Sequence, residues 1–242
     1  MQLLILIKEK EHMENKLLGN NILNRIITAL ILIPITIYAI ISNGILFDLF
    51  FSIAFFLSCY EAVKIINKQN LILWNKKLSW IIGAIIYIIL SFISFKYCRL
   101  HSQGCLIIIM LLFSIWTFDI TAYLAGTLIK GPRLCPKISP KKTWAGLIIG
   151  ILIAFFLPQF IFTHIFTKIF IYNFGLVTEY HFALIGVIAQ IGDLIQSYFK
   201  RQFNVKNSSN ILPGHGGILD RLDSLYLSSM LIYFVLTYTN MY

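Results

Sequence analysis

The sequence is poor in charge. Only 10 acidic and 20 basic residues occur among 242, which is 12% of the chain. A soluble domain of this length carries about twice that fraction. Hydrophobic residues make up 58% of the chain, and the mean hydropathy is +0.81. The composition excludes an ordinary soluble enzyme and a soluble basic domain that binds nucleic acid, and it predicts a polytopic membrane protein.

The chain is also poor in cysteine and in repeated sequence. Its cysteines, Cys59, Cys98, Cys105 and Cys135, form no CxxC pair, so they indicate neither a metal site nor a disulfide framework. The N-terminal MQLLILI is too short to span a bilayer and precedes KEKE without a cleavage site of small residues, so it is not a secretory signal peptide. Met1 and Met13 both remain candidate start residues.

Long apolar runs predict an all-α, polytopic bundle of about seven, and at most nine, transmembrane helices. The seven expected spans are 22–42, 46–63, 78–95, 104–128, 143–166, 180–199 and 222–240. The stretch 143–174, interrupted by Pro158, has room for an additional or re-entrant segment. We expect residues 1–21 to form a cytoplasmic segment and residues 22–242 to form one membrane-embedded domain.

The basic residues predict the orientation of these spans. Of the 20 Lys and Arg residues, 17 fall on one side, and only Lys96, Arg99 and Lys168 fall on the other. The positive-inside rule therefore predicts a cytoplasmic N-terminus in a multi-pass protein of the inner membrane. Attraction to the anionic headgroups of the lipid bilayer explains most of the formal charge of +10.

Polar and ionisable residues concentrate between residues 193 and 224, flanked by apolar runs. At about 100° per residue, Gln190, Ser197, Lys200 and Arg201 share one side of a helix with Asp193. An intramembrane aspartate must face a cavity or a partner. Asp193 alone fits two roles equally well: a packing group paired with Lys or Arg, or a site residue.

The segment that follows indicates a site more strongly. Pro213-Gly214-His215-Gly216-Gly217 is a permissive elbow, whose glycines allow backbone N–H groups to approach phosphate oxygens. We expect a helix to begin near Ile218, with Asp220, Asp223 and Ser224 on one face. Helix capping would explain the two aspartates alone. Together with Arg221 and the glycines, they favour metal-assisted phosphate chemistry.

The same residues carry a family resemblance. The runs Ser197–Arg201 (SYFKR) and Leu212–Asp223 (LPGHGGILDRLD), with Lys206 between them, resemble the signature of the phosphatidate cytidylyltransferases, also called CDP-diacylglycerol synthases. The run Asp119–Gly126 (DITAYLAG), followed by PKISPKKTWAG up to Gly146, is similar to the upstream region of the family. One departure is Asn207, where the family usually has aspartate.

The resemblance implies the reaction of CTP with phosphatidate, giving CDP-diacylglycerol and pyrophosphate. It implies Mg²⁺ as the cofactor and leaves open whether a monovalent cation such as K⁺ joins it. The expected metal ligands are Asp193 and Asp220, with Asp223 close by. Lys200 and Arg201 complete the expected catalytic set. The expected substrate-binding residues are Asp119, Ser139, Lys141, Lys142, Ser197, Lys206, His215, Gly216, Gly217 and Arg221.

Several alternatives stay open. Thr143 or Ser139 could merely cap the fifth span, and Lys141 and Lys142 could be membrane anchors. Gly146 and Gly150 form a GxxxG pattern, which indicates close helix contact and a possible homodimer. A transporter that uses Asp119 and Asp193 would predict internal repeats, which we do not find. A CTP-dependent lipid kinase would differ in its products, and the CDP-alcohol phosphotransferases would need aspartates spaced along one helix.

Overall fold

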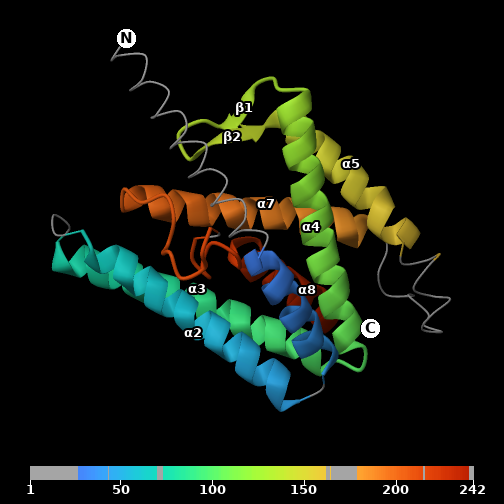
Figure 1. The fold of residues 1–242 in the computed structure, drawn as a ribbon, viewed down its shortest axis with the longest axis horizontal. Helices are drawn as coiled ribbons and strands as arrows, with labels where there is room; N and C mark the ends of the chain where they lie inside the picture. The colour runs from blue at the N-terminus through green and yellow to red at the C-terminus, as the bar shows by residue number, and fades with distance from the viewer. Residues whose placement is uncertain are drawn as a thin grey trace, which may run out of the picture.

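The computed structural model describes residues 27–42, 44–69, 73–161, 164, 179–214 and 216–239. Within them lie seven helices and one β-hairpin (Figure 1). The helices are Ile27–Ile41, α2 (Ile45–Asn67), α3 (Trp74–Leu100), α4 (Gly104–Leu128), α5 (Trp144–Ile161), α7 (Glu179–Gln202) and α8 (Asp223–Thr239). The predicted helical fold is confirmed, and each expected span overlaps one of these helices.

Four of these helices are long and apolar enough to cross a membrane: α2, α3, α4 and residues His181–Gln202 of α7. The helices Ile27–Ile41 and Trp144–Pro158 are apolar but shorter. Pro158 lies inside α5. The expected segment 1–21 and most of the stretch after Ile161, where an additional segment was expected, lie outside the described residues.

One short β-hairpin, which the sequence did not predict, interrupts the otherwise α-helical fold. Strands β1 (Arg133–Cys135) and β2 (Ser139–Thr143) form an antiparallel hairpin between α4 and α5. The residues Pro136–Ile138 turn the chain, and Trp144 N donates to Pro132 O across 3.1 Å. Pro136 and Pro140 disfavour helix here, so the polar connection pairs with itself before α5 begins.

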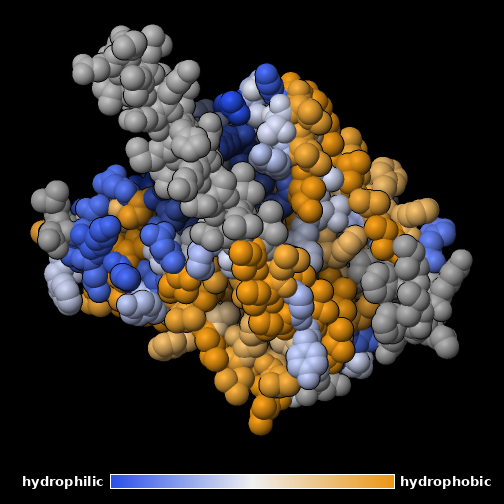
Figure 2. Space-filling view, viewed as in Figure 1, coloured by the Kyte–Doolittle hydropathy of each residue, from blue (hydrophilic) through white to orange (hydrophobic). Residues whose placement is uncertain are grey.

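Aromatic residues fill the core between α2, α3 and α8. The rings of Phe51 and Phe95 lie 4.7 Å apart, and the ring of Phe55 lies 5.5 Å from that of Tyr226. All four side chains are buried. Outside, apolar side chains dominate the surface of the lower half in Figure 2, whereas hydrophilic ones gather over the hairpin and over the α2–α3 end. The molecule thus has an apolar exterior suited to lipid and a polar end.

Small residues bring α4 and α5 together. A Cβ atom added to Gly146 would lie 2.5 Å from the Ala122 carbonyl oxygen, and one added to Gly150 would lie 3.0 Å from the Phe118 ring. The GxxxG pair therefore packs against α4 of the same chain. This contact accounts for the pattern without a second copy, so the pattern no longer argues for a homodimer.

Helix α7 turns its polar stripe inward, as predicted. Gln190 and Lys200 are buried, whereas Ile191 and Ile195 on the opposite side are exposed. Phe199, which the helical spacing also places on that opposite side, is buried against Trp80 and Phe203. Where α7 crosses α8, Gly192 lies so close that an added Cβ atom would meet the Asp223 carbonyl oxygen at 2.9 Å.

We predict that Gly192→Ala lowers the melting temperature of the purified protein by several degrees. The new methyl group must displace the backbone of α8, and such overpacking costs about 1–3 kcal/mol. Gly83→Ala is the matched control, because a Cβ atom at Gly83 meets no other atom within 4 Å. Equal melting temperatures for both variants would contradict the observed crossing.

Candidate active site

A buried carboxylate, Glu61 of α2, organises the loop between α7 and α8. Its side chain is fully buried. Oε2 accepts hydrogen bonds from Ser208 Oγ (2.7 Å) and Leu219 N (2.9 Å). Oε1 accepts from Ser209 Oγ (2.6 Å) and Ile218 N (3.1 Å). The charge is stabilised by four donors, which all belong to the loop.

The glycines of the elbow make this arrangement possible. A Cβ atom on Gly217 would collide with Ser208 Oγ and Glu61 Oε2, and Gly216 has a φ of 85°, which favours glycine. Gly216 N donates to Leu212 O (3.1 Å), and Gly217 N donates to Asp220 Oδ2 (3.2 Å). These two N–H groups therefore hold the loop together, and their binding of phosphate stays a prediction.

The last helix also begins later than expected. α8 starts at Asp223 and not near Ile218. The preceding residues form a separate turn in which Arg221 N and Leu222 N donate to Ile218 O. Glu61 takes the N–H groups of Ile218 and Leu219, so an acid from another helix caps this turn. Asp220 consequently lies in the turn, and Asp223 alone begins the helix.

Asp220 is held by the loop on both carboxylate oxygens. Oδ1 pairs with Lys200 Nζ at 2.7 Å, and both side chains are about nine-tenths buried. Oδ2 accepts from Ser208 N (2.8 Å) and from Gly217 N, and it lies 3.1 Å from Ser208 Oγ, whose single proton is donated to Glu61. Burial disfavours the charged form, but Lys200 and the hydrogen bonds outweigh it and lower the pKa of the Asp220 carboxyl. Asp220 is thus ionised, and its ion pair with Lys200 links the loop to α7.

Asp193 pairs with a lysine from the hairpin region. Lys142 Nζ forms an ion pair with Asp193 Oδ2, and Ser197 Oγ donates to Asp193 Oδ1 across 3.3 Å. Thr143 Oγ1 accepts from Gly146 N (3.1 Å), so the expected cap on α5 is confirmed for Thr143. Asp193 therefore forms the ion pair expected of a packing group, and it also lines a cavity.

The acid-lined cavity has a volume of about 320 Å³ and gathers the four aspartates of the signature regions. Its lining residues are Asp119, Asp193, Lys200, Asn207, Asp220, Arg221, Asp223 and Ser224. They come from α4, α7, α8 and the α7–α8 loop. The predicted convergence of Asp193, Asp220 and Asp223 on one cavity is observed.

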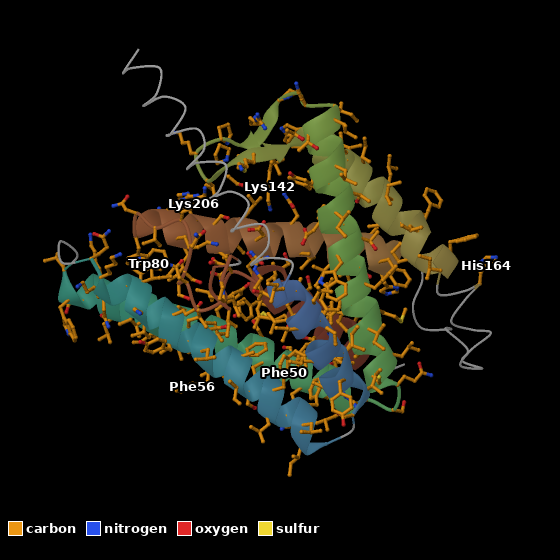
Figure 3. All side chains as sticks on the ribbon, in the orientation of Figure 1. Phe50, Phe56, Trp80, Lys142, His164 and Lys206 are labelled. Atoms are coloured by element: carbon orange, nitrogen blue, oxygen red, sulfur yellow. The ribbon has the colours of Figure 1, made fainter. Side chains whose placement is uncertain are left out.

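The cation-lined cavity, of about 580 Å³, shares Asp119 and Asp193 with the first. Its basic lining residues are Lys130, Arg133, Lys141 and Lys142, and its polar ones include Tyr123, Thr127, Ser139, Thr143 and Gln190. Figure 3 shows Lys142 between the hairpin and α7. Four cations in one cavity suit a polyphosphate, and four acids in the other suit a divalent cation.

Other predicted residues lie beside the cavities. Arg201 donates to Ile138 O (3.4 Å) and Val205 O (3.0 Å), so it links the hairpin turn to the end of α7 and the loop that follows. Lys206 is exposed and lines neither cavity. His215 lies outside the described residues.

Sequence reasoning missed the role of Glu61. An acid within the apolar run LSCYEAVKII was a sufficient signal that it faces a partner. Its partner, however, lies about 150 positions further along the chain. The sequence also gave no reason to place Lys130 and Arg133 in the site, since basic residues at a membrane edge are usually anchors.

The donor set fits a Mg²⁺ ion completed by water and phosphate. Across the described residues, no three acidic, histidine or cysteine side chains are grouped to hold a metal ion alone. Mg²⁺ keeps several waters and needs only one or two carboxylates when substrate phosphates complete its shell. Asp193 and Asp223, brought together where α7 crosses α8 at Gly192, can supply these carboxylates.

Comparison with known proteins identifies the family of this chain. Residues 72–239 match the model of the cytidylyltransferase family, and they include both cavities. The chain therefore belongs to the cytidylyltransferase family, a family of enzymes.

Similar curated proteins are named phosphatidate cytidylyltransferase. The one from Rickettsia bellii is 35% identical over 237 residues, covering 96% of this chain and 98% of its own. That of Rickettsia conorii is 33% identical over 235 residues, with the same coverage. That of Brucella abortus is 34% identical over 161 residues, or 66% of this chain and 58% of its own. The resemblance to the phosphatidate cytidylyltransferases is thereby confirmed.

We predict that Glu61→Gln lowers the free energy of unfolding by about 3 kcal/mol. An amide cannot accept four hydrogen bonds, and bonds to a charged acceptor contribute about 1.5–3 kcal/mol each. Unfolding in mixed micelles measures the loss, and hydrogen exchange at Ile218 and Leu219 locates it.

The control for Glu61→Gln is Asp48→Asn on the same helix. Asp48 pairs with Lys96 at 3.2 Å, and both side chains are nearly half exposed. This change should alter stability by less than about 1 kcal/mol. Unchanged exchange at Ile218 and Leu219 in Glu61→Gln would refute the role of Glu61.

Proposed function

We propose that this protein transfers the cytidylyl group from CTP to phosphatidate, giving CDP-diacylglycerol and pyrophosphate. The observation that carries the proposal is the pair of cavities that meet at Asp119 and Asp193, one lined by cations and the other by acids. A nucleotide triphosphate fits the first by charge. The similarity to curated phosphatidate cytidylyltransferases along almost the whole chain supports the choice of substrates.

The reaction needs alignment and charge neutralisation more than a strong base. An oxygen of the phosphatidate phosphate attacks the α-phosphorus of CTP, and the bond from the α-phosphorus to the oxygen bridging to the β-phosphorus breaks. Pyrophosphate leaves with that oxygen and its electron pair. The lipid phosphate has a second pKa near 6, so it is largely a dianion at pH 7. The barrier is then mostly repulsion between anions.

Basic side chains of both cavities would reduce this repulsion between the two anionic substrates. Lys130, Arg133 and Lys141 would hold the triphosphate in the cation-lined cavity. Lys142 pairs with Asp193 at the junction, and an arriving phosphate would compete for it. Lys200, fixed by Asp220, and Arg221 would hold the lipid phosphate on the acid side.

A bound Mg²⁺ would neutralise phosphate charge and orient the α-phosphate. We assign Asp193 and Asp223 as its carboxylate ligands, with Asp119 on the facing helix. Asp220 was the other ligand expected from the sequence. Its two oxygens already accept from Lys200, Ser208 and Gly217, so we assign it to holding Lys200 and the loop.

We further propose that the site opens at the cytoplasmic face of a bacterial inner membrane. The residues Lys130, Arg133, Lys141, Lys200 and Arg221 all belong to connections that the positive-inside rule assigns to the cytoplasm, or to the helix ends beside them. CTP is a water-soluble cytoplasmic nucleotide, whereas phosphatidate stays in the bilayer. A site at this boundary reaches both.

The decisive experiment incubates the purified protein in detergent with CTP, phosphatidate and Mg²⁺. We expect CDP-diacylglycerol and pyrophosphate in equal amounts, and none after the metal is chelated. A CTP-dependent lipid kinase would instead release CDP and transfer the γ-phosphoryl group. Monodisperse protein that forms no CDP-diacylglycerol would refute the proposal.

Asp193→Asn should lower kcat/KM by about 10²–10⁴-fold, because a bound Mg²⁺ would lose one of its two assigned carboxylate ligands. Its melting temperature should change little, since the amide still accepts from Ser197. Asp48→Asn, far from both cavities, serves as the control for activity. Loss of folding together with activity in Asp193→Asn would assign Asp193 to packing instead.

A further inference from the structure

An apolar groove lies against the outer side of α7, behind the acid-lined cavity. We call it the lateral groove. It has a volume of about 270 Å³ and is lined by Ala62, Trp80, Gly83, Ala84, Tyr87, Ile88, Ile195, Gln196, Tyr198, Phe199 and Leu219. In Figure 3, Trp80 lies between α3 and α7. The groove is several times larger than the roughly 30 Å³ of a water molecule, so it accommodates a chain segment.

The lateral groove faces the region that lipid would occupy. At its rim, Ile195 and Tyr198 are exposed, and a Cβ atom at Gly83 would meet nothing within 4 Å. Helices α3 and α7 both carry apolar stretches long enough to cross a membrane. An acyl chain can therefore enter sideways from the bilayer without crossing water.

Two pairs of consecutive residues separate the lateral groove from the acid-lined cavity. Phe199 lines the groove, and the next residue, Lys200, lines the cavity. On the loop, Leu219 likewise lines the groove, and the next residue, Asp220, lines the cavity. On α7, Gln196 lies about 60° around the helix from Asp193, between the polar stripe and Phe199. A lipid whose phosphate lies among the aspartates would have its first apolar atoms here.

Two residues that line the groove each carry a buried polar atom without a partner. Gln196 is 5% exposed, yet its Oε1 accepts no hydrogen bond from the described residues. The Tyr87 hydroxyl is likewise buried without a hydrogen-bond partner among them. Native structures rarely leave such atoms unsatisfied. Two unpaired polar atoms on residues that line an otherwise apolar groove match a ligand that is apolar except for one polar group.

We propose that the lateral groove binds one acyl chain of the lipid substrate at its ester end, with Tyr87 and Gln196 as specificity-determining residues. The Tyr87 hydroxyl donates to the ester carbonyl. A half-turn of the Gln196 amide exchanges its oxygen and nitrogen, so that Nε2 donates as well. This inference rests on the proposed function and deepens it, because it assigns the ester-linked chain its own subsite.

The test compares diacyl phosphatidate with its dialkyl ether analogue, which keeps the phosphate and chains but lacks the carbonyl groups. For the purified wild-type protein, we expect kcat/KM to be about tenfold higher with the diacyl lipid. Gln196→Leu should lower this ratio well below tenfold by raising the KM for the diacyl lipid, while the KM for CTP stays the same; the remaining preference is that of Tyr87. Gln202→Leu, at the exposed end of the same helix, should keep the wild-type ratio.

A second variant tests the groove by volume. Gly83→Leu places a side chain in open space, so folding is preserved while the groove is filled. We expect the KM for both lipids to rise about tenfold, with an unchanged KM for CTP. If Gln196→Leu does not fold, Gly83→Leu alone tests whether the lateral groove binds the lipid substrate.

The outcomes separate this inference from the proposed function. Wild-type protein that makes no CDP-diacylglycerol would refute the proposed function. Wild-type activity with an unchanged diacyl-to-dialkyl ratio in Gln196→Leu and an unchanged lipid KM in Gly83→Leu would overturn this inference alone. The groove would then hold bulk membrane lipid and not the substrate.

Discussion

The site depends on one buried charge. Glu61 is fully buried on the apolar helix α2, where an isolated carboxylate would be very unfavourable. It is tolerated because Ser208, Ser209, Ile218 and Leu219 direct four donors at it. These contacts hold both ends of the loop that carries Asp220 and leads into Asp223. The acid-lined cavity therefore keeps its shape through a residue that does not line it.

The resting site neutralises its own charges. Lys142 pairs with Asp193, and Lys200 pairs with Asp220, so each lysine meets an acid before any substrate arrives. The two pairs differ in their surroundings. Asp220 is fixed by two further hydrogen bonds from the loop, whereas Asp193 has one, from Ser197. A phosphate can thus separate Lys142 from Asp193 with fewer broken contacts than it would need to separate Lys200 from Asp220. Substrate binding should therefore rearrange the ion pair at the junction of the cavities first.

Much of the fold could be predicted because lipid imposes a simple rule: apolar runs become helices. The expected span 104–128 coincides with α4, and the polar stripe on α7 turns inward as its spacing indicated. The hairpin between Arg133 and Thr143 was missed because charge and proline identify a connection without giving its pairing. The start of α8 was misplaced because the turn after Gly217 is capped by Glu61 from a distant helix. Local patterns contain no information about such a contact.

The span of sequence between Glu61 and its partners has a consequence for biogenesis. Leu219 lies 158 positions after Glu61, so at 5–20 residues per second a ribosome needs roughly 10–30 s to supply it. During that interval α2 carries a carboxylate without its native donors. The helices that are synthesised first must then remain in the translocon or in contact with water. Membrane proteases would recognise a chain that ends before residue 219. The site can therefore assemble only after residue 219 has been synthesised.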